Sequence, residues 1–224
     1  LEDAEKLYLE AIDRLTDAGL DPSDEMTDTL AGLAELYFRM GRFEDAEPLL
    51  ARVLEARQKT LGSDAPEVFD AMEELALNRW DQGRLEDAES GLRDALYLRR
   101  EHFGSEPHPD LAENINNLAL VLMDLGEYDE SEILYTEAQT MATRLYGEQH
   151  PSLAVGLNNL GQLYRAKGDL EAAEATYADA LEMSRSLLGD KHPDVAMALV
   201  NLALVHYDQA RLDLAIDNVN QALD

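Results

Sequence analysis

Two sets of glycines recur along this chain with one common period. The first set has spacings of 42, 43 and 42 residues: Gly41, Gly83, Gly126 and Gly168. The second set has the same spacings and falls about half a period later: Gly62, Gly104, Gly147 and Gly189. A period of this length is typical of a repeat architecture, in which each unit buries its apolar face against its neighbours. The repeat therefore constrains the fold more than any local motif does.

Each period predicts two helices. Apolar residues recur at helical spacing, as in Leu118, Val121, Leu122 and Leu125. Proline stands at the start of the first helix of a unit, where its missing N–H costs nothing, and glycine follows helix ends, where positive φ is needed. We expect A helices at 25–40, 66–82, 109–125, 151–167 and 193–209. We expect B helices at 2–18, 44–60, 86–102, 129–145, 171–187 and 213–224.

The sequence shows no period-two run and no hairpin signal, so no strand is expected. The predicted fold is all-α, an α-solenoid of antiparallel helix pairs that forms a single array over residues 1–224. The array divides into helix B of a partial repeat at 1–18 and repeats at 24–62, 66–104, 109–147, 151–189 and 193–224, the last with a short final helix. Because Leu1 opens within a helical pattern, we expect a fragment of a longer protein.

The composition excludes several function classes. The 224 residues carry 18 Lys and Arg against 47 Asp and Glu, a formal net charge of −29. Such acidity argues against nucleic acid and against anionic membrane surfaces as partners. The chain has no Cys, no apolar run long enough to span a bilayer and no signal-peptide pattern. A cytoplasmic location is expected on this basis, and no cofactor is implied.

Two neighbouring units share a sequence motif. One unit reads His108-Pro109-Asp110-Leu111-Ala112 and then Ile115-Asn116-Asn117-Leu118-Ala119. The next reads His150-Pro151-Ser152-Leu153-Ala154 and then Leu157-Asn158-Asn159-Leu160-Gly161. With this motif the units resemble tetratricopeptide repeats, and in particular those of the kinesin-light-chain-like subfamily. The resemblance implies a right-handed superhelix whose A helices line a concave groove. The N-terminal units depart from the pattern, because Ala31-Gly32 and Glu73-Glu74 replace the Asn pair.

The register of the A helices predicts which side chains face the groove. Thirty such positions hold nine acidic and two basic residues. The C-terminal half is rich in amides and apolar residues, whereas the N-terminal half is acidic with two large aromatics. The candidate peptide-binding residues are Asn117, Asn159, Asn201, Asn116, Asn158, Gln162, Arg165, Trp80, Met123, Tyr207, Glu73 and Glu74.

An asparagine at the same position of each repeat can hold the backbone of an extended peptide, because its amide both donates and accepts. The resemblance implies the same use of these asparagines. An alternative interpretation is that they bond neighbouring helices and that Trp80 packs on its own stack. The acidic groove favours a basic or mixed-charge partner, although the acidity could equally serve solubility.

Catalytic and metal chemistry is not expected. His108, His150 and His192 recur at the repeat period, and their place before Pro indicates a loop that leads into a helix. One period separates them too far for a shared coordination shell. A glutamate also recurs, at 5, 47, 89, 132 and 174, and its position next to a small packing residue predicts helix-surface or inter-repeat pairs.

Three functions remain open at this point. The first is a non-enzymatic protein-interaction scaffold. The second is a regulatory or sensor domain of a larger bacterial enzyme, such as a kinase or protease. The third is an architectural module that self-associates through the ends of the array, which expose apolar surface unless they are capped.

Overall fold

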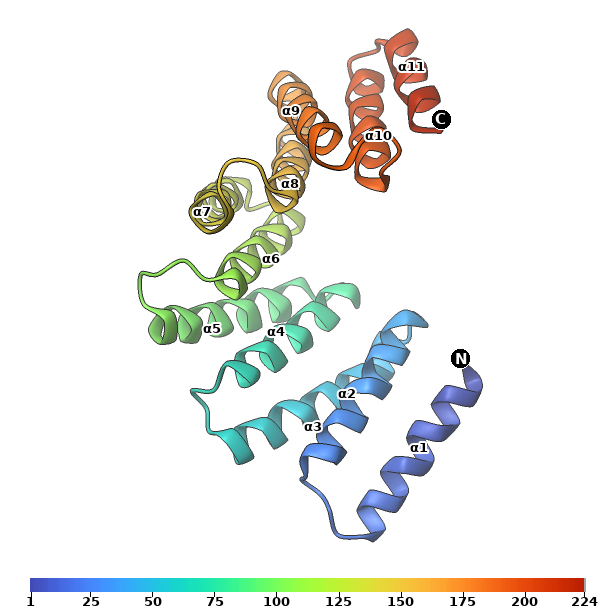
Figure 1. Ribbon diagram of the computed structural model, residues 1–224, viewed down its shortest axis with the longest axis vertical. Helices are drawn as coiled ribbons and strands as arrows, with labels where there is room; N and C mark the ends of the chain where they lie inside the picture. The colour runs from blue at the N-terminus through green and yellow to red at the C-terminus, as the bar shows by residue number, and fades with distance from the viewer. Residues whose placement is uncertain (224) are drawn as a thin grey trace. The chain divides into compact units, whose positions relative to one another are not determined.

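The computed structural model describes residues 1–223, which form eleven α-helices and no strand (Figure 1). The chain divides into two compact units, residues 1–105 and 106–224. The first unit contains α1 (Glu2–Asp17), α2 (Asp24–Arg39), α3 (Phe43–Leu61), α4 (Pro66–Asp81) and α5 (Leu85–Phe103). The second contains α6 (Pro109–Leu125), α7 (Tyr128–Tyr146), α8 (Pro151–Lys167), α9 (Leu170–Leu188), α10 (Pro193–Asp208) and α11 (Leu212–Leu223).

The predicted helices are confirmed, and each end lies within one residue of its expected position. The last residue of the expected helix 213–224 lies outside the described residues. Within each unit every helix packs against the next one in the chain, as in a solenoid of helix pairs (Figure 1). In the second unit the A helices also contact each other, α6 with α8 and α8 with α10.

The periodic glycines and histidines set the helix ends. Gly126 and Gly168 follow A helices in the left-handed region, with φ of 83° and 80°. Ala210 takes the same place after α10 with φ of 60°, although it carries a Cβ. The Nδ1 atoms of three histidines accept hydrogen bonds from the backbone N–H two residues later, which caps α6, α8 and α10: His108, His150 and His192. The interpretation of these histidines as helix-leading residues is confirmed.

Small residues allow the helices to approach closely. A Cβ added to Gly161 of α8 would lie 2.8 Å from the ring of Tyr177 in α9. Ala88 and Ala173 are fully buried at equivalent positions of α5 and α9. The alternation of small and large side chains therefore fixes helix-on-helix packing, as ridges meeting grooves require.

Four of the recurring glutamates tie a B helix to the segment that follows it, whereas Glu89 of α5 pairs with Arg93 of its own helix. Glu174 of α9 accepts hydrogen bonds from Gln209 and Arg211, at 3.0 and 2.7 Å, and lies 3.2 Å from Nε2 of His206. Glu132 of α7 binds Tyr164 and Lys167 of α8 in the same way. Similar contacts join Glu5 to Tyr37 and Arg42, and Glu47 to Arg79, Gln82 and Arg84. These are the predicted inter-repeat pairs.

No helix among residues 1–223 combines the length and apolar character that a membrane span requires.

Candidate peptide-binding face

The predicted groove positions of the second unit lie on three successive A helices, α6, α8 and α10. We call this surface the A-helix face and define it by its groove-register residues: Glu113, Asn116, Asn117, Asp124, Val155, Asn159, Gln162, Arg165, Met197, Val200, Asn201, Leu204, Tyr207 and Asp208. Because α6 contacts α8 and α8 contacts α10, these residues form neighbouring rows.

Hydrogen bonds join two pairs of asparagines on these helices. Nδ2 of Asn159 donates to Oδ1 of Asn116 over 3.0 Å, and Nδ2 of Asn201 donates to Oδ1 of Asn158 over 3.2 Å. Each pair links one A helix to the next, so the interpretation that the asparagines bond neighbouring helices holds for these four. An amide offers two donors and an acceptor with two lone pairs, so one such bond leaves capacity for a ligand.

Large apolar side chains surround the amides. Met197, Val200, Leu204 and Tyr207 of α10 are 49%, 44%, 41% and 65% exposed, and Val155 of α8 is 45% exposed. Scattered exposed apolar residues are normal, but a cluster on one face marks an interaction site. The A-helix face therefore combines apolar contact area with amides.

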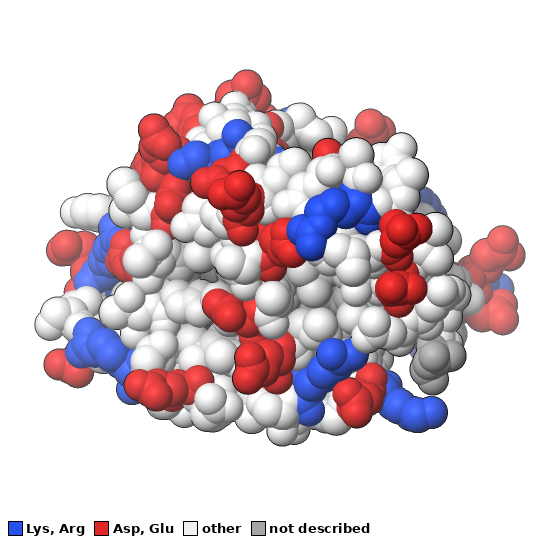
Figure 2. All heavy atoms as spheres, turned by 90° about the horizontal axis from the view of Figure 1, so that it is seen from above, with Lys and Arg blue, Asp and Glu red and all other residues white. Residues whose placement is uncertain are grey.

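The charges of this face are mostly negative. Nε of Arg165 lies 2.6 Å from Oδ2 of Asp208, so this guanidinium already has a carboxylate partner. Glu113 and Asp124 are exposed on α6. Acidic side chains are also spread over the surface seen in Figure 2, with basic ones between them. Acidic side chains are thus not confined to the A-helix face.

Three of the predicted site residues lie in the interior. Met123 is 6% exposed, and Asn158 and Glu73 are each 7% exposed. Asn158 also donates through Nδ2 to the carbonyl oxygen of Ala154 over 3.0 Å. A ligand on the surface does not reach these side chains, so we retain them only as supports of the residues around them.

Glu73 belongs to a buried ion cluster of the first unit. Arg99 of α5 is 2% exposed, and its guanidinium binds both Glu73 and Asp70 of α4. The Nη2 atom of Arg99 lies 2.6 Å from Oδ1 of Asp70. The cluster neutralises Glu73, which had been predicted to face a peptide.

The remaining candidates of the first unit are Glu74 and Trp80. Trp80 is half-buried and Glu74 is exposed. Packing around its carboxyl raises the pKa of Glu74, and the nearby Asp70 and Glu35 raise it further against the opposing effect of Arg57. A carboxylate among other carboxylates favours a cationic ligand group, because the ligand's charge relieves their repulsion.

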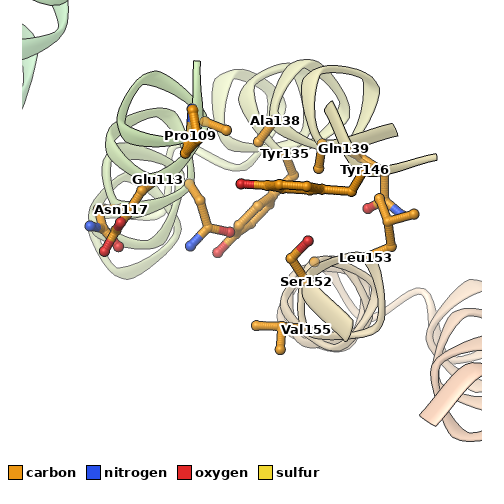
Figure 3. Close-up of a pocket in the computed structure, with 14 residues that line it drawn as sticks. Pro109, Glu113, Asn117, Tyr135, Ala138, Gln139, Tyr146, Ser152, Leu153 and Val155 are labelled. Atoms are coloured by element: carbon orange, nitrogen blue, oxygen red, sulfur yellow. The ribbon is translucent and has the colours of Figure 1, made fainter. Parts of the chain in front are cut away.

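A cavity of about 360 Å³ lies between α6 and α8, with α7 as its floor (Figure 3). Sequence reasoning missed it, because groove positions were sought on A helices only, whereas its tyrosines come from a B helix. Tyr135 and Tyr146 of α7 extend their rings into the space between the two A helices. Glu113, Asn116, Asn117 and Val155 also line it, so the cavity adjoins the A-helix face.

Metal binding has no support in the part of the chain that the structure describes, since no group of three or more His, Asp or Glu side chains there could hold an ion.

A family profile described as tetratricopeptide repeat matches residues 25–101, 110–186 and 157–224. A search of curated protein sequences finds no significant match. The solved structure of BtubC (BKLC) from P. vanneervenii is 26% identical, with a TM-score of 0.80, and the match covers 99% of this chain and 89% of that one.

Two further solved structures share the fold. The putative kinesin light chain repeats of Podospora anserina are 22% identical, with a TM-score of 0.74 and coverage of 87% of this chain and 92% of that one. A Rap protein complexed with competence and sporulation factor is 14% identical, with a TM-score of 0.71 and coverage of 94% and 61%. The predicted resemblance to kinesin-light-chain-like repeats is thereby confirmed.

Proposed function

Because the chain belongs to the tetratricopeptide repeat family, we propose that it is a protein-interaction scaffold whose A-helix face binds an extended segment of a partner protein. One observation carries this proposal. Val155, Met197, Val200, Leu204 and Tyr207 are all more than a third exposed, and they lie on α8 and α10, two of the three helices that carry the paired asparagines.

The chemistry of the face favours an extended peptide segment that offers backbone hydrogen-bonding groups and apolar side chains. The spare N–H and lone pairs of Asn159 and Asn201 can bind peptide carbonyl and N–H groups. Apolar side chains of the segment would cover Leu204 and its neighbours, which releases ordered water. Because Arg165 is already paired with Asp208, the net charge of the face stays negative and favours a segment that carries Lys or Arg.

A structure of similar fold supports ligand binding by such an array, since the Rap protein was solved in complex with competence and sporulation factor. That complex belongs to the Rap protein. For the present chain it supports a binding role and leaves the partner to experiment.

Panning a phage-displayed library of random peptides on the full chain tests the proposal. One enriched peptide is then synthesised with a fluorophore, and its affinity is measured by anisotropy. We expect Leu204→Asp to weaken binding at least about tenfold, since it places a charge in the apolar contact. We also expect enrichment of Lys and Arg and weaker binding at higher ionic strength.

Ile133→Asp is the matched control. Ile133 is 66% exposed on α7 and lies outside the A-helix face, so the same change of charge should leave the affinity unaltered. A library without enriched sequences, or equal loss of binding in both variants, would contradict the proposal.

A further inference from the structure

The cavity between α6 and α8 is bordered by a carboxylate that has no counter-charge. Glu113 of α6 is exposed, lines the cavity and forms no ion pair with any residue that the structure describes. It is also the only charged side chain among the described lining residues. An ionised carboxylate accepts hydrogen bonds and donates none. The cavity therefore offers one negative charge whose acceptors are not used by the protein itself.

The hydroxyl of Ser152 on α8 is a second acceptor at the same cavity. Nδ1 of His150 accepts a hydrogen bond from the backbone N–H of Ser152, so this nitrogen carries no proton. The Oγ atom of Ser152 lies 2.7 Å from the same nitrogen and therefore donates its proton to it. Ser152 is exposed and lines the cavity, so the lone pairs of its Oγ are left for a ligand.

An exposed aromatic ring also borders the cavity. Tyr146 of α7 is 40% exposed, and its ring extends into the space between α6 and α8 (Figure 3). The imidazole of His150 stacks on one face of this ring, with centroids 4.2 Å apart and an angle of 18° between the planes. This contact holds the ring in place and leaves its opposite face for a ligand. The face of a tyrosine ring attracts cations, and a planar cation can stack on it.

We propose that this cavity binds the side chain of an arginine in the partner segment. The proposal rests on the proposed function, because the segment on the A-helix face, to which Glu113 and Val155 belong, delivers the side chain. The guanidinium donates hydrogen bonds to the Glu113 carboxylate and to Oγ of Ser152, and its plane stacks on Tyr146. The methylene groups of the arginine lie against Val155, which is 45% exposed.

Other side chains match these groups less well. A guanidinium has five N–H donors and no acceptor, which suits a carboxylate and a hydroxyl that both accept. The ammonium of lysine carries the same charge, but it is a compact point charge and has no plane that could stack on Tyr146. Aspartate and glutamate would bring a second negative charge beside Glu113. The cavity volume of about 360 Å³ lies within the range of about 300–1,000 Å³ that ligand pockets occupy.

Three small probes test the cavity without a partner segment. They are the N-acetyl amides of arginine, lysine and citrulline, and citrulline has the shape of arginine without its charge. Each is titrated into the isotope-labelled full chain, and amide shifts are followed by two-dimensional NMR. We expect the arginine probe to shift the amides of Glu113, Ser152 and Gly156. We expect the lysine probe to bind about threefold and the citrulline probe about fivefold more weakly.

Glu113→Gln and Tyr146→Leu separate the two contributions. Glu113→Gln should lower the affinity for the arginine probe about fivefold, because the charge-assisted hydrogen bond is lost. Tyr146→Leu should abolish the preference for arginine over lysine and keep that for arginine over citrulline. Tyr146→Phe should retain both preferences, because the ring face remains.

Glu171→Gln is the matched control. Glu171 is exposed on α9 and does not line the cavity, so the same loss of charge should leave the affinity for the arginine probe unaltered. Far-UV circular dichroism checks that all variants fold.

Equal affinity for the three probes, or shifts confined to other parts of the chain, would overturn the proposal. So would equal losses in Glu113→Gln and Glu171→Gln, since they would indicate attraction to the acidic surface in general. An unchanged preference for arginine over lysine in Tyr146→Leu would overturn the stacking on Tyr146. None of these results would affect the proposed scaffold function, which Leu204→Asp tests with a peptide on the A-helix face.

Discussion

Asn201 of α10 donates a hydrogen bond from Nδ2 to Oδ1 of Asn158 in α8 over 3.2 Å, and the two residues are 43 positions apart. Asn158 is buried, so this bond satisfies an acceptor that water reaches poorly. The bond repeats one unit earlier between Asn159 and Asn116. Asparagines of the A-helix face therefore set how neighbouring A helices sit, in addition to any contact with a ligand.

The first prediction concerns this amide pair. Asn201→Ala should lower the free energy of unfolding by about 1–2 kcal/mol, because Oδ1 of Asn158 is left without its donor. Gln162→Ala, on the exposed surface of α8, should change it by less than about 0.5 kcal/mol. Urea unfolding followed by circular dichroism measures both. Equal stability of the two variants would show that the amide bond contributes nothing.

A second prediction concerns the left-handed residues that follow the A helices. Ala210 has φ of 60° where the preceding unit has Gly168 with φ of 80°. Ala210→Gly should therefore stabilise the chain by up to about 1 kcal/mol, because glycine adopts this conformation without steric cost. The reverse change, Gly168→Ala, should destabilise it by a similar amount. Thermal unfolding of both variants should shift in opposite directions, and shifts of one sign would contradict this account.

The third prediction concerns the buried ion cluster of the first unit. Arg99→Met should cost about 3–5 kcal/mol, since it removes the guanidinium that binds the buried Glu73. The double variant Glu73→Leu with Arg99→Met should regain most of that loss, because both charges are gone and Asp70 is partly exposed to water. Chemical denaturation of the single and double variants forms a cycle. A double variant as unstable as Arg99→Met would argue against charge burial as the cause.

A fourth prediction concerns the loss of folding stability at acidic pH. Partial burial would raise the pKa of Glu174, but hydrogen bonds from Gln209, His206 and Arg211 outweigh it and hold this pKa below its ordinary value of 4.5. Since the folded-state pKa is the lower one, the unfolded chain binds a proton first as the pH falls. The stability from Glu174 is therefore full above pH 4.5 and is lost as the pH falls from there through the folded-state pKa.

Denaturation measured at a series of pH values tests this point. Glu174→Gln should lower stability near neutrality and flatten the decline below pH 4.5. Glu171→Gln, at an exposed position of the same helix, should leave the decline as in the parent chain. An unchanged slope in Glu174→Gln would remove this carboxylate as a cause of acid sensitivity.

Sequence reasoning located the helices because glycine, proline and apolar spacing are local signals. Gly126 and Pro151 mark helix ends through their own backbone preferences, and the same signals recur from repeat to repeat. The inter-repeat role of Glu174 also followed from its repeated position. Such features depend on residues whose partners lie at a fixed offset along the chain.

The site was less predictable, because burial and pairing depend on neighbouring helices. Glu73 was placed on the groove, but Arg99 of the following helix binds it in the interior. Met123 has a groove register and yet is buried. The register of Tyr135 predicted a packing residue. Only the structure shows that its hydroxyl makes no hydrogen bond and that the residue lines the cavity between α6 and α8.

The contacts that join a glutamate of a B helix to the segment after it span 32 to 37 residues in the examples of Glu5 and Glu174. A pulling force applied to the two ends of such a unit would break these contacts one after another, since each contact joins only adjacent segments. We expect a single chain held in optical tweezers to lengthen in several small steps at low force. Breaking one glutamate contact would then weaken a single step and leave the others at their original force.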